Sequence, residues 1–222
     1  MTQPLALVSD FDGTISDDDF FNYVVRRYLD DKALEPWRSY QSGKKKHFDA
    51  LAEIFAKLRV PQNEFETFID SIKIDKGFIE LASFCAARKI PVYICSAGSD
   101  YYIRQRLKGC LERLNIILIS NPGVYSENSG LIIHPNGRYY DSELGVSKAG
   151  VVQELRKKGF YVIYCGDGGP DINAARFAQK VFARSCLYKL CRQQGISAEK
   201  LESFDNVKKF IEEKADEISA YD

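Results

Sequence analysis

Two aspartates lie two positions apart, directly after the first apolar run of the chain. The sequence there reads Leu5-Ala-Leu-Val-Ser-Asp-Phe-Asp-Gly-Thr14. In an extended segment alternate side chains point the same way, so Asp10 and Asp12 face one side and Phe11 faces the other. Because a carboxyl group has an ordinary pKa of about 4, Asp10 is ionised at neutral pH and is able to act as a nucleophile without a neighbouring base.

Further residues supply the charges and donors that attack on a phosphoryl group would need. An attacking anion is repelled by a phosphoryl group, and a Mg²⁺ ion held by carboxylates, together with a lysine, supplies positive charge between them. Asp167 and Asp171 could add ligands for that ion, and Lys148 could supply the ammonium group. Ser96 and the backbone N–H groups after it, beginning with Ala97, could hold phosphate oxygens. Each residue alone has an ordinary explanation as a cap or a solvated side chain, but their joint order favours phosphoryl transfer.

Four short apolar runs predict the strands that position these residues, at 5–8, 91–95, 115–119 and 161–165. The runs are continuous rather than alternating, which is typical of parallel strands covered by helices on both faces. Helix-like segments separate them, at 78–88, 101–114 and 148–158. This alternation predicts an α/β fold with a Rossmann-like, doubly wound parallel sheet as its core. The polar loops after three of the runs should converge on one site, because ligands bind at the carboxyl ends of such strands.

The long segment between the first two strands is interpreted as an inserted helical cap. From residue 20 to residue 72 it is rich in helix formers and aromatic residues and shows no strand pattern. We therefore expect an α/β core over residues 1–16 and 76–222, with a helical cap domain over residues 17–75.

Two smaller elements are expected within the second part of the core. Asn136-Gly137, with apolar residues before it and Arg138-Tyr-Tyr140 after it, predicts the turn of a β-hairpin. The charged segment 198–220 predicts a helix that packs on the sheet through its spaced apolar residues.

Composition excludes several classes of partner and site. The 31 Lys and Arg residues balance 31 Asp and Glu residues, so no basic field favours a nucleic acid or a membrane surface. No apolar run approaches the roughly 18 residues of a membrane helix. Six cysteines without a Cys-x-x-Cys pair, and only two histidines, give no zinc site at familiar spacing. We expect a cytoplasmic protein with buried, reduced cysteines, and the sequence leaves its oligomeric state open.

Four segments resemble, in order, the motifs of the haloacid dehalogenase superfamily of phosphohydrolases. The first is Leu7-Val-Ser-Asp-Phe-Asp-Gly-Thr14 and the second is Ile94-Cys-Ser-Ala-Gly98. Lys148 resembles the third motif, and Cys165-Gly-Asp-Gly-Gly-Pro-Asp171 resembles the fourth. The helical insertion directly after the first motif resembles the C1 cap of the phosphoserine-phosphatase-like subclass. The resemblance covers nearly the whole chain.

The resemblance also implies a role for each motif residue. Asp10 would become phosphorylated, and Asp12 would protonate the leaving oxygen and then activate water. Asp10, the backbone carbonyl of Asp12 and Asp167 would hold Mg²⁺, with Asp171 assisting through water or hydrogen bonds. An aspartate at position 12 favours phosphoryl transfer over carbon–halogen chemistry, because only phosphoryl transfer needs this acid and base. The implied function is a Mg²⁺-dependent phosphomonoesterase acting on a small phosphorylated metabolite through an aspartyl-phosphate intermediate. A phosphotransferase or phosphomutase on the same motifs, and a non-catalytic binding module on the same fold, are the alternatives.

Two cap positions bear on the substrate. Phosphoserine phosphatases carry a cap glutamate nine positions after the nucleophile and a cap arginine that holds the substrate carboxylate. This sequence has Asp19 at the first position and Glu53 in the neighbourhood of the second, which argues against phosphoserine. The segment from Val181 to Phe204 resembles more closely the enol-phosphate phosphatases of methionine salvage. Asp19 and Glu53 are the expected specificity residues.

Other cap residues have a structural and a functional interpretation. Trp37, Tyr23 and Tyr40 are interpreted as the core of the cap, with an aromatic substrate pocket as the alternative. Lys44-Lys-Lys-His47 is interpreted as a solvated segment, with a basic rim for phosphorylated substrates as the alternative. Asp17-Asp-Asp19 is expected at a helix N-terminus, where negative charge is favourable and where Asp19 would also be close to substrate.

Overall fold

A six-stranded sheet forms the centre of the molecule, which the computed structural model describes from residue 3 to residue 219. The strand order is β3-β2-β1-β6-β7-β8, and every pairing is parallel. The strands are β1 (Leu5–Ser9), β2 (Val92–Ser99), β3 (Ile116–Asn121), β6 (Tyr161–Gly166), β7 (Lys180–Ala183) and β8 (Glu199–Lys200). The predicted α/β fold with a doubly wound parallel sheet is confirmed.

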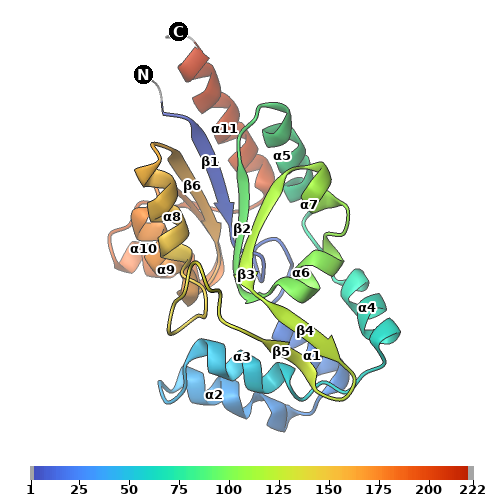
Figure 1. The fold of residues 1–222 in the computed structure, drawn as a ribbon. Helices are drawn as coiled ribbons and strands as arrows, with labels where there is room; N and C mark the ends of the chain where they lie inside the picture. The colour runs from blue at the N-terminus through green and yellow to red at the C-terminus, as the bar shows by residue number, and fades with distance from the viewer. Residues whose placement is uncertain (1–2, 220–222) are drawn as a thin grey trace.

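Helices cover both faces of this sheet (Figure 1). Alternate residues of β1 enter two separate cores, with Leu5 and Leu7 in one and Ala6 and Val8 in the other. The first core includes residues of α5 (Lys76–Ala87) and α11 (Phe204–Ser219) and continues into the helices between β1 and α5. The second core includes residues of α8 (Lys148–Lys157), α9 (Ile172–Phe177) and α10 (Ser185–Gln193). Because β1 is buried on both faces, the position of the residue that follows it is fixed. None of the helices within residues 3–219 combines the length and apolar character needed to span a membrane.

The helix predicted over 101–114 is two helices. α6 (Asp100–Arg106) and α7 (Cys110–Arg113) are separated at Gly109, which adopts a φ of 73°. A glycine takes this left-handed conformation at little cost, so the chain turns there instead of continuing as a helix.

The carboxyl-terminal third also differs from expectation. The strands β7 and β8 are not predicted, because four and two residues are too few to show a clear period. The terminal helix starts at Phe204 instead of residue 198, and residue 220 of the predicted range lies outside the described residues.

The segment between β1 and α5 is helical, as predicted for a cap. Figure 1 shows α1, α2 and α3 beyond the carboxyl end of β1. Ser16 forms an antiparallel bridge with Ile74, and the backbone N–H of Asp75 donates to the carbonyl of Ile15 over 2.8 Å. The chain therefore leaves and re-enters the core at one place. The elements of this segment are α1 (Phe20–Tyr28), a 3₁₀ turn (Asp31–Leu34), α2 (Glu35–Gln41), α3 (His47–Phe55) and α4 (Gln62–Ser71).

A β-hairpin from the second half of the chain packs against these helices. It consists of β4 (Gly123–Ser126) and β5 (Gly130–Ile133), and β5 contacts α3. The hydroxyl of Tyr125 donates to the carbonyl of Val60 over 2.6 Å. The hairpin therefore contacts the helices of segment 17–75, although it belongs to the second half of the chain.

The predicted position of the hairpin turn is wrong. The turn falls between Ser126 and Gly130, where Gly130 adopts a φ of 76°. Asn136 instead accepts hydrogen bonds from the backbone N–H groups of Arg138 and Tyr139, at 3.1 and 2.9 Å. Such side-chain bonding to nearby backbone stabilises a local loop that does not need flanking strands.

Candidate active site

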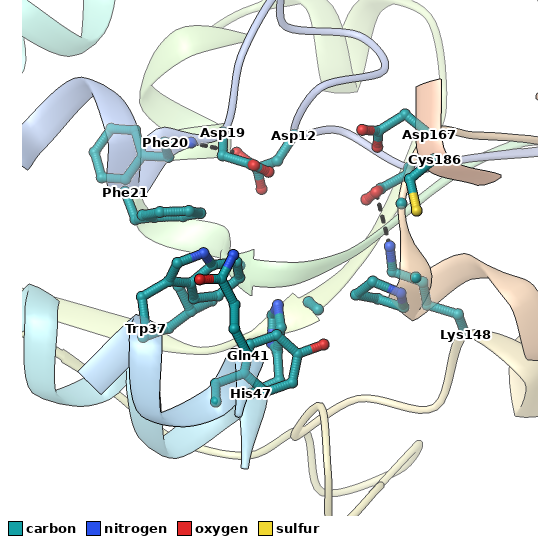
Figure 2. Close-up of a pocket in the computed structure, with 18 of the residues that line it drawn as sticks. Asp12, Asp19, Phe20, Phe21, Trp37, Gln41, His47, Lys148, Asp167 and Cys186 are labelled. Carbon is teal, nitrogen blue, oxygen red and sulfur yellow. Dashed lines mark hydrogen bonds and ion pairs between the residues drawn. The ribbon is translucent and has the colours of Figure 1, made fainter. Parts of the chain in front are cut away.

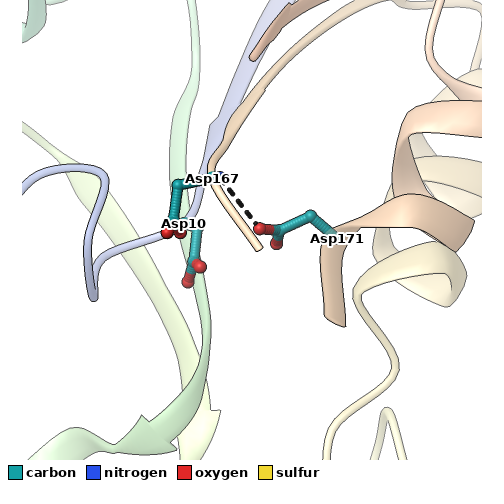
Figure 3. Close-up of side chains that lie close together, drawn as sticks. All are labelled: Asp10, Asp167 and Asp171. Atoms are coloured by element: carbon teal, nitrogen blue, oxygen red, sulfur yellow. Dashed lines mark hydrogen bonds between the residues drawn. The ribbon is translucent and has the colours of Figure 1, made fainter. Parts of the chain in front are cut away.

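Three carboxylates meet where β1 and β6 end. Asp10 follows β1, and Asp167 and Asp171 follow β6, which is the direct neighbour of β1 in the sheet. One oxygen from each of the three lies within 4.8 Å of the others (Figure 3). Hard oxygen ligands of this kind suit a hard divalent cation, so this cluster is able to hold a metal ion.

Lys148 supplies the positive charge of the site. It is the first residue of α8, is 2% exposed, and lies 2.8 Å from Asp10 Oδ2 and 2.6 Å from Asp171 Oδ1. Burial by itself lowers the pKa of this ammonium group, but Asp10 and Asp171 outweigh burial and raise it above its ordinary value. Lys148 therefore stays charged beside Asp10.

Asp171 is held by four donors and is completely buried. Its Oδ1 accepts from Lys148 Nζ and from the hydroxyl of Tyr164, both over 2.6 Å. Its Oδ2 accepts from the backbone N–H groups of Asp167 and Gly168, at 3.1 and 2.9 Å. Asp171 thus fixes both the lysine and the loop that carries Asp167.

Of the three carboxylates of the cluster, Asp10 and Asp167 line the cavity described below. Burial, followed by the charge of Asp171, raises the pKa of both, to about 7 for Asp167, and the charge of Lys148 opposes the rise. Asp167 also accepts a hydrogen bond from the hydroxyl of Thr14 over 3.2 Å. Gly13 permits this approach, because a β-carbon there would lie 2.6 Å from Asp167 Oδ2. The turn after β1 therefore needs a glycine.

Asp12 is bound by a different set of groups. Its Oδ2 accepts from the hydroxyls of Tyr102 and Ser96, at 2.6 and 3.1 Å, and its Oδ1 accepts from the backbone N–H of Phe20 over 3.1 Å. Burial raises its pKa, and the hydrogen bonds oppose the rise. A β-carbon at Gly98 would lie 1.7 Å from the Tyr102 hydroxyl and 2.8 Å from Asp12 Oδ2, so only glycine fits beside this pair.

A cavity of about 590 Å³ joins these groups to the helical cap. In Figure 2, Asp12, Asp167 and Lys148 border one side of it, and Trp37 and His47 of the cap lie opposite. A ligand in this cavity would contact the carboxylates with one end and the cap with the other.

A comparison with protein families identifies the family to which this chain belongs. A family model described as haloacid dehalogenase-like hydrolase matches residues 7–176, which include every motif residue discussed above. The chain belongs to this hydrolase family. The resemblance seen in the sequence is therefore confirmed.

Individual relatives are similar to this hydrolase along its length. A 2-hydroxy-3-keto-5-methylthiopentenyl-1-phosphate phosphatase of Bacillus cereus is 26% identical over 204 residues, covering 90% of this chain and 92% of its own. The corresponding protein of Bacillus velezensis is 27% identical over 222 residues, covering 96% and 92%. Among solved structures, a substrate-bound phosphoserine phosphatase superposes with a TM-score of 0.70 at 14% identity, covering 95% of this chain and 99% of that one. That structural likeness shows a shared fold.

The structure brings most of the predicted site residues of this hydrolase to the cavity. Six of them line it: Asp10, Asp12, Asp19, Ala97, Lys148 and Asp167. Ser96 and Asp171 are fully buried behind its wall. The Ser96 hydroxyl is directed to Asp12 and accepts from the backbone N–H of Gly98 over 3.0 Å, so it reaches the site through Asp12.

The two expected specificity residues have different positions. Asp19 lines the cavity, and burial, followed by the charges of Asp12 and Asp167, raises its pKa to about 8. Its side chain makes no capping hydrogen bond to α1. Glu53 does not line the cavity: it is 51% exposed and forms an ion pair with Lys45. The buried positions of α3 include Ala50, Leu51 and Ile54, so the helical period turns Glu53 toward solvent. Glu53 is therefore not at the cavity, in contrast to the expected contact with substrate.

Some residues of the site are not predicted from the sequence, and others have a position that differs from the expected one. Nothing in the local pattern marks Tyr102, which lies ninety residues after Asp12 and meets it only in the folded protein. Trp37 and Tyr40 line the cavity, which supports the alternative of an aromatic pocket, whereas Tyr23 bonds to Asp17 and does not line it. His47 is buried at this wall, in contrast to the solvated segment expected at 44–47.

Proposed function

We propose that this chain is a Mg²⁺-dependent phosphomonoesterase that hydrolyses a small phosphorylated metabolite through an aspartyl-phosphate on Asp10. The observation that carries this proposal is the contact of Asp10 with Lys148, 2.8 Å apart, beside Asp167 in a cavity large enough for a metabolite. Membership in the hydrolase family and the phosphatases among its relatives support it. Asp10 and Asp167 would hold the ion with the backbone carbonyl of Asp12, and an all-oxygen donor set suits Mg²⁺ better than zinc.

The residues of this chain divide the proposed reaction into two steps. In the first, a carboxylate oxygen of Asp10 bonds to phosphorus while the bond to the leaving oxygen breaks, and Asp12 gives its proton to that oxygen. In the second, Asp12 takes a proton from water as the water oxygen bonds to phosphorus, which releases phosphate and restores Asp10. Lys148 offsets the growing charge on the phosphoryl oxygens, and a Mg²⁺ ion held by Asp10 and Asp167 would supply further positive charge there.

The cap is proposed to select the leaving group. We propose that residues 17–75 act as a domain that covers the cavity, with Asp19 as one of its contacts to substrate. The compound named for the Bacillus relatives, 2-hydroxy-3-keto-5-methylthiopentenyl-1-phosphate, is the first candidate to assay. The six free cysteines agree with a reducing compartment such as the cytoplasm.

The experiment is to measure phosphate release from a panel of phosphorylated metabolites in Mg²⁺ with no acceptor other than water. A phosphomonoesterase releases stoichiometric phosphate, and Asp10→Asn abolishes the release. A phosphotransferase or phosphomutase would show turnover only when an acceptor or an isomerisable sugar phosphate is supplied. Ligand binding without turnover under any condition would favour the non-catalytic module and contradict the proposal.

A further inference from the structure

The cap side of the cavity is a continuous aromatic wall. Trp37 lies at its centre, with ring centroids 4.1 Å from Phe21, 4.9 Å from Tyr40 and 5.4 Å from His47. All four side chains line the cavity, and they come from α1, α2 and α3. Aromatic faces gain most from a flat, apolar ligand segment that stacks on them or packs against their edges.

The same wall has no cation for a second anionic group. Among residues 3–219, Lys148 is the only lysine or arginine that lines the cavity, and it is already paired with Asp10 and Asp171. His47 also lines the wall, but burial lowers its pKa to about 3, so the imidazole is neutral at physiological pH. A carboxylate on the leaving group would lose part of its hydration at this wall without gaining a cationic partner.

The other ionisable groups near this wall supply no cation either. Asp19 adds a carboxyl group to the cavity lining. The lysines before His47 do not line the cavity: Lys45 pairs with Glu53, and Lys44 and Lys46 are exposed. These lysines therefore do not supply a cation to the cavity lining.

We propose, on the basis of the proposed phosphatase function, that the substrates of this chain are monoesters whose leaving group is uncharged and contains a flat apolar part that packs on Trp37. Trp37, Tyr40 and His47 are the residues that set this preference. Phosphorylated amino acids and phosphorylated carboxylic acids are therefore poor substrates. The leaving group makes its contacts with the cap, and the phosphoryl group makes its contacts with Lys148 and the acidic cluster.

Trp37 permits a binding test that does not depend on turnover. It is the only tryptophan of the chain, so its fluorescence reports on this cavity wall alone. Phenylphosphonate, 4-phosphonobenzoate and methylphosphonate are titrated in Mg²⁺, since a phosphonate has no ester oxygen to leave. We expect phenylphosphonate to change the fluorescence and to bind about tenfold or more tightly than the other two. Equal affinity for phenylphosphonate and 4-phosphonobenzoate would overturn the proposal.

A gain-of-function variant sharpens the test. Gln41 is an exposed residue at the cavity lining, and Gln41→Arg adds the missing cation at the cap. We expect it to improve the affinity for 4-phosphonobenzoate relative to phenylphosphonate by about tenfold, because an arginine pairs well with a carboxylate. Gln193→Arg, which adds the same charge on exposed surface outside the cavity lining, should leave the ratio unchanged. An equal change in both variants would show a general charge effect and contradict the assignment of this wall.

The outcomes separate this inference from the function on which it rests. If the expected order of phosphonate affinities appears but no ester is hydrolysed, the recognition surface stands and the phosphatase proposal fails. If phenyl phosphate and 4-carboxyphenyl phosphate are hydrolysed with equal kcat/KM, the phosphatase proposal stands and the preference for an uncharged leaving group is wrong.

Discussion

The two sides of the cavity are built from opposite kinds of residue. On the core side, buried charges lie within hydrogen-bond distance of one another, as in the contacts of Lys148 with Asp10 and Asp171. On the cap side, the lining consists mainly of aromatic and neutral side chains around Trp37 and His47. Buried charges are costly unless they are paired, so the core fixes each of them through several partners. Aromatic rings need no such network.

This difference separates the chemistry of the site from its recognition of substrate. The core groups lie at the ends of buried strands, where neighbouring elements fix their geometry. The cap groups lie on short helices of a segment that leaves the core at Ser16 and returns to it at Ile74. Changes on the core side should therefore lower turnover of every substrate, whereas changes on the cap side should alter which substrates are preferred.

The largest effect is expected at the nucleophile. Asp10→Asn replaces the carboxylate nucleophile by a non-nucleophilic amide of similar shape, so kcat should fall by about 10³-fold or more while the fold is kept. Asp31→Asn, at a cap carboxylate that is 78% exposed, is the matched control and should keep turnover within about twofold. A folded Asp10→Asn protein with a tenth of wild-type turnover would contradict the assignment.

Removal of the metal is expected to have an effect of similar size. Excess EDTA should lower turnover by about 10²-fold or more, because the charge that offsets repulsion between Asp10 and the phosphoryl group is lost. Mg²⁺ should restore the rate. Ca²⁺ should not, since its larger and looser coordination shell would displace Asp10 from phosphorus. Full turnover in EDTA would show that turnover does not need a metal ion bound to the acidic cluster.

Tyr102 is expected to act as a positioning residue for Asp12. Tyr102→Phe removes the 2.6 Å hydrogen bond but keeps the ring that stacks on Phe20 with centroids 3.8 Å apart. Because this hydrogen bond positions Asp12, its loss should lower kcat by about tenfold and leave KM nearly unchanged. Tyr140→Phe, at an exposed tyrosine, is the control. A lower melting temperature with unchanged kcat would mean that the hydroxyl only stabilises the fold.

His47 should make the stability of the protein depend on pH. Burial lowers its folded-state pKa to about 3 from an ordinary value of 6.5, so the unfolded chain takes up a proton first. Its contribution is fully present above pH 6.5 and is lost as the pH falls from there toward 3, by up to about 1.4 kcal/mol per pH unit. Denaturant unfolding of His47→Gln between pH 7 and pH 5 should show a smaller loss than wild type. His134→Gln, at an exposed histidine, should match wild type; equal slopes for all three proteins would refute the prediction.

The smallest effect is expected at Glu53. Its ion pair with Lys45 lies on the solvent side of α3, and exposed pairs contribute little. Glu53→Gln should change the free energy of unfolding by less than about 0.5 kcal/mol and leave the substrate preference as it is. A shift in the kcat/KM ratio between phenyl phosphate and 4-carboxyphenyl phosphate would show that Glu53 does influence substrate preference.

The sequence alone determined the fold class and the chemical groups of the core side. Continuous apolar runs predicted buried parallel strands, and parallel strands bring their carboxyl ends to one edge of the sheet. For that reason Asp10 and Asp167 could be assigned to one site before their distances were known, and the order of the motifs added Lys148 to it. The position of each follows from its place at the end of a strand or the start of a helix.

Only the tertiary structure decided the cap side and the partners of Asp12. Glu53 lies on α3 and Trp37 on α2, and whether each faces the cavity depends on how its helix is rotated about its own axis. The apolar residues of these short helices do not define that rotation uniquely. The contact between Tyr102 and Asp12 joins two elements through their packing. Local sequence specifies which elements form, whereas contacts between side chains on different elements depend on distances and angles that arise only when those elements pack.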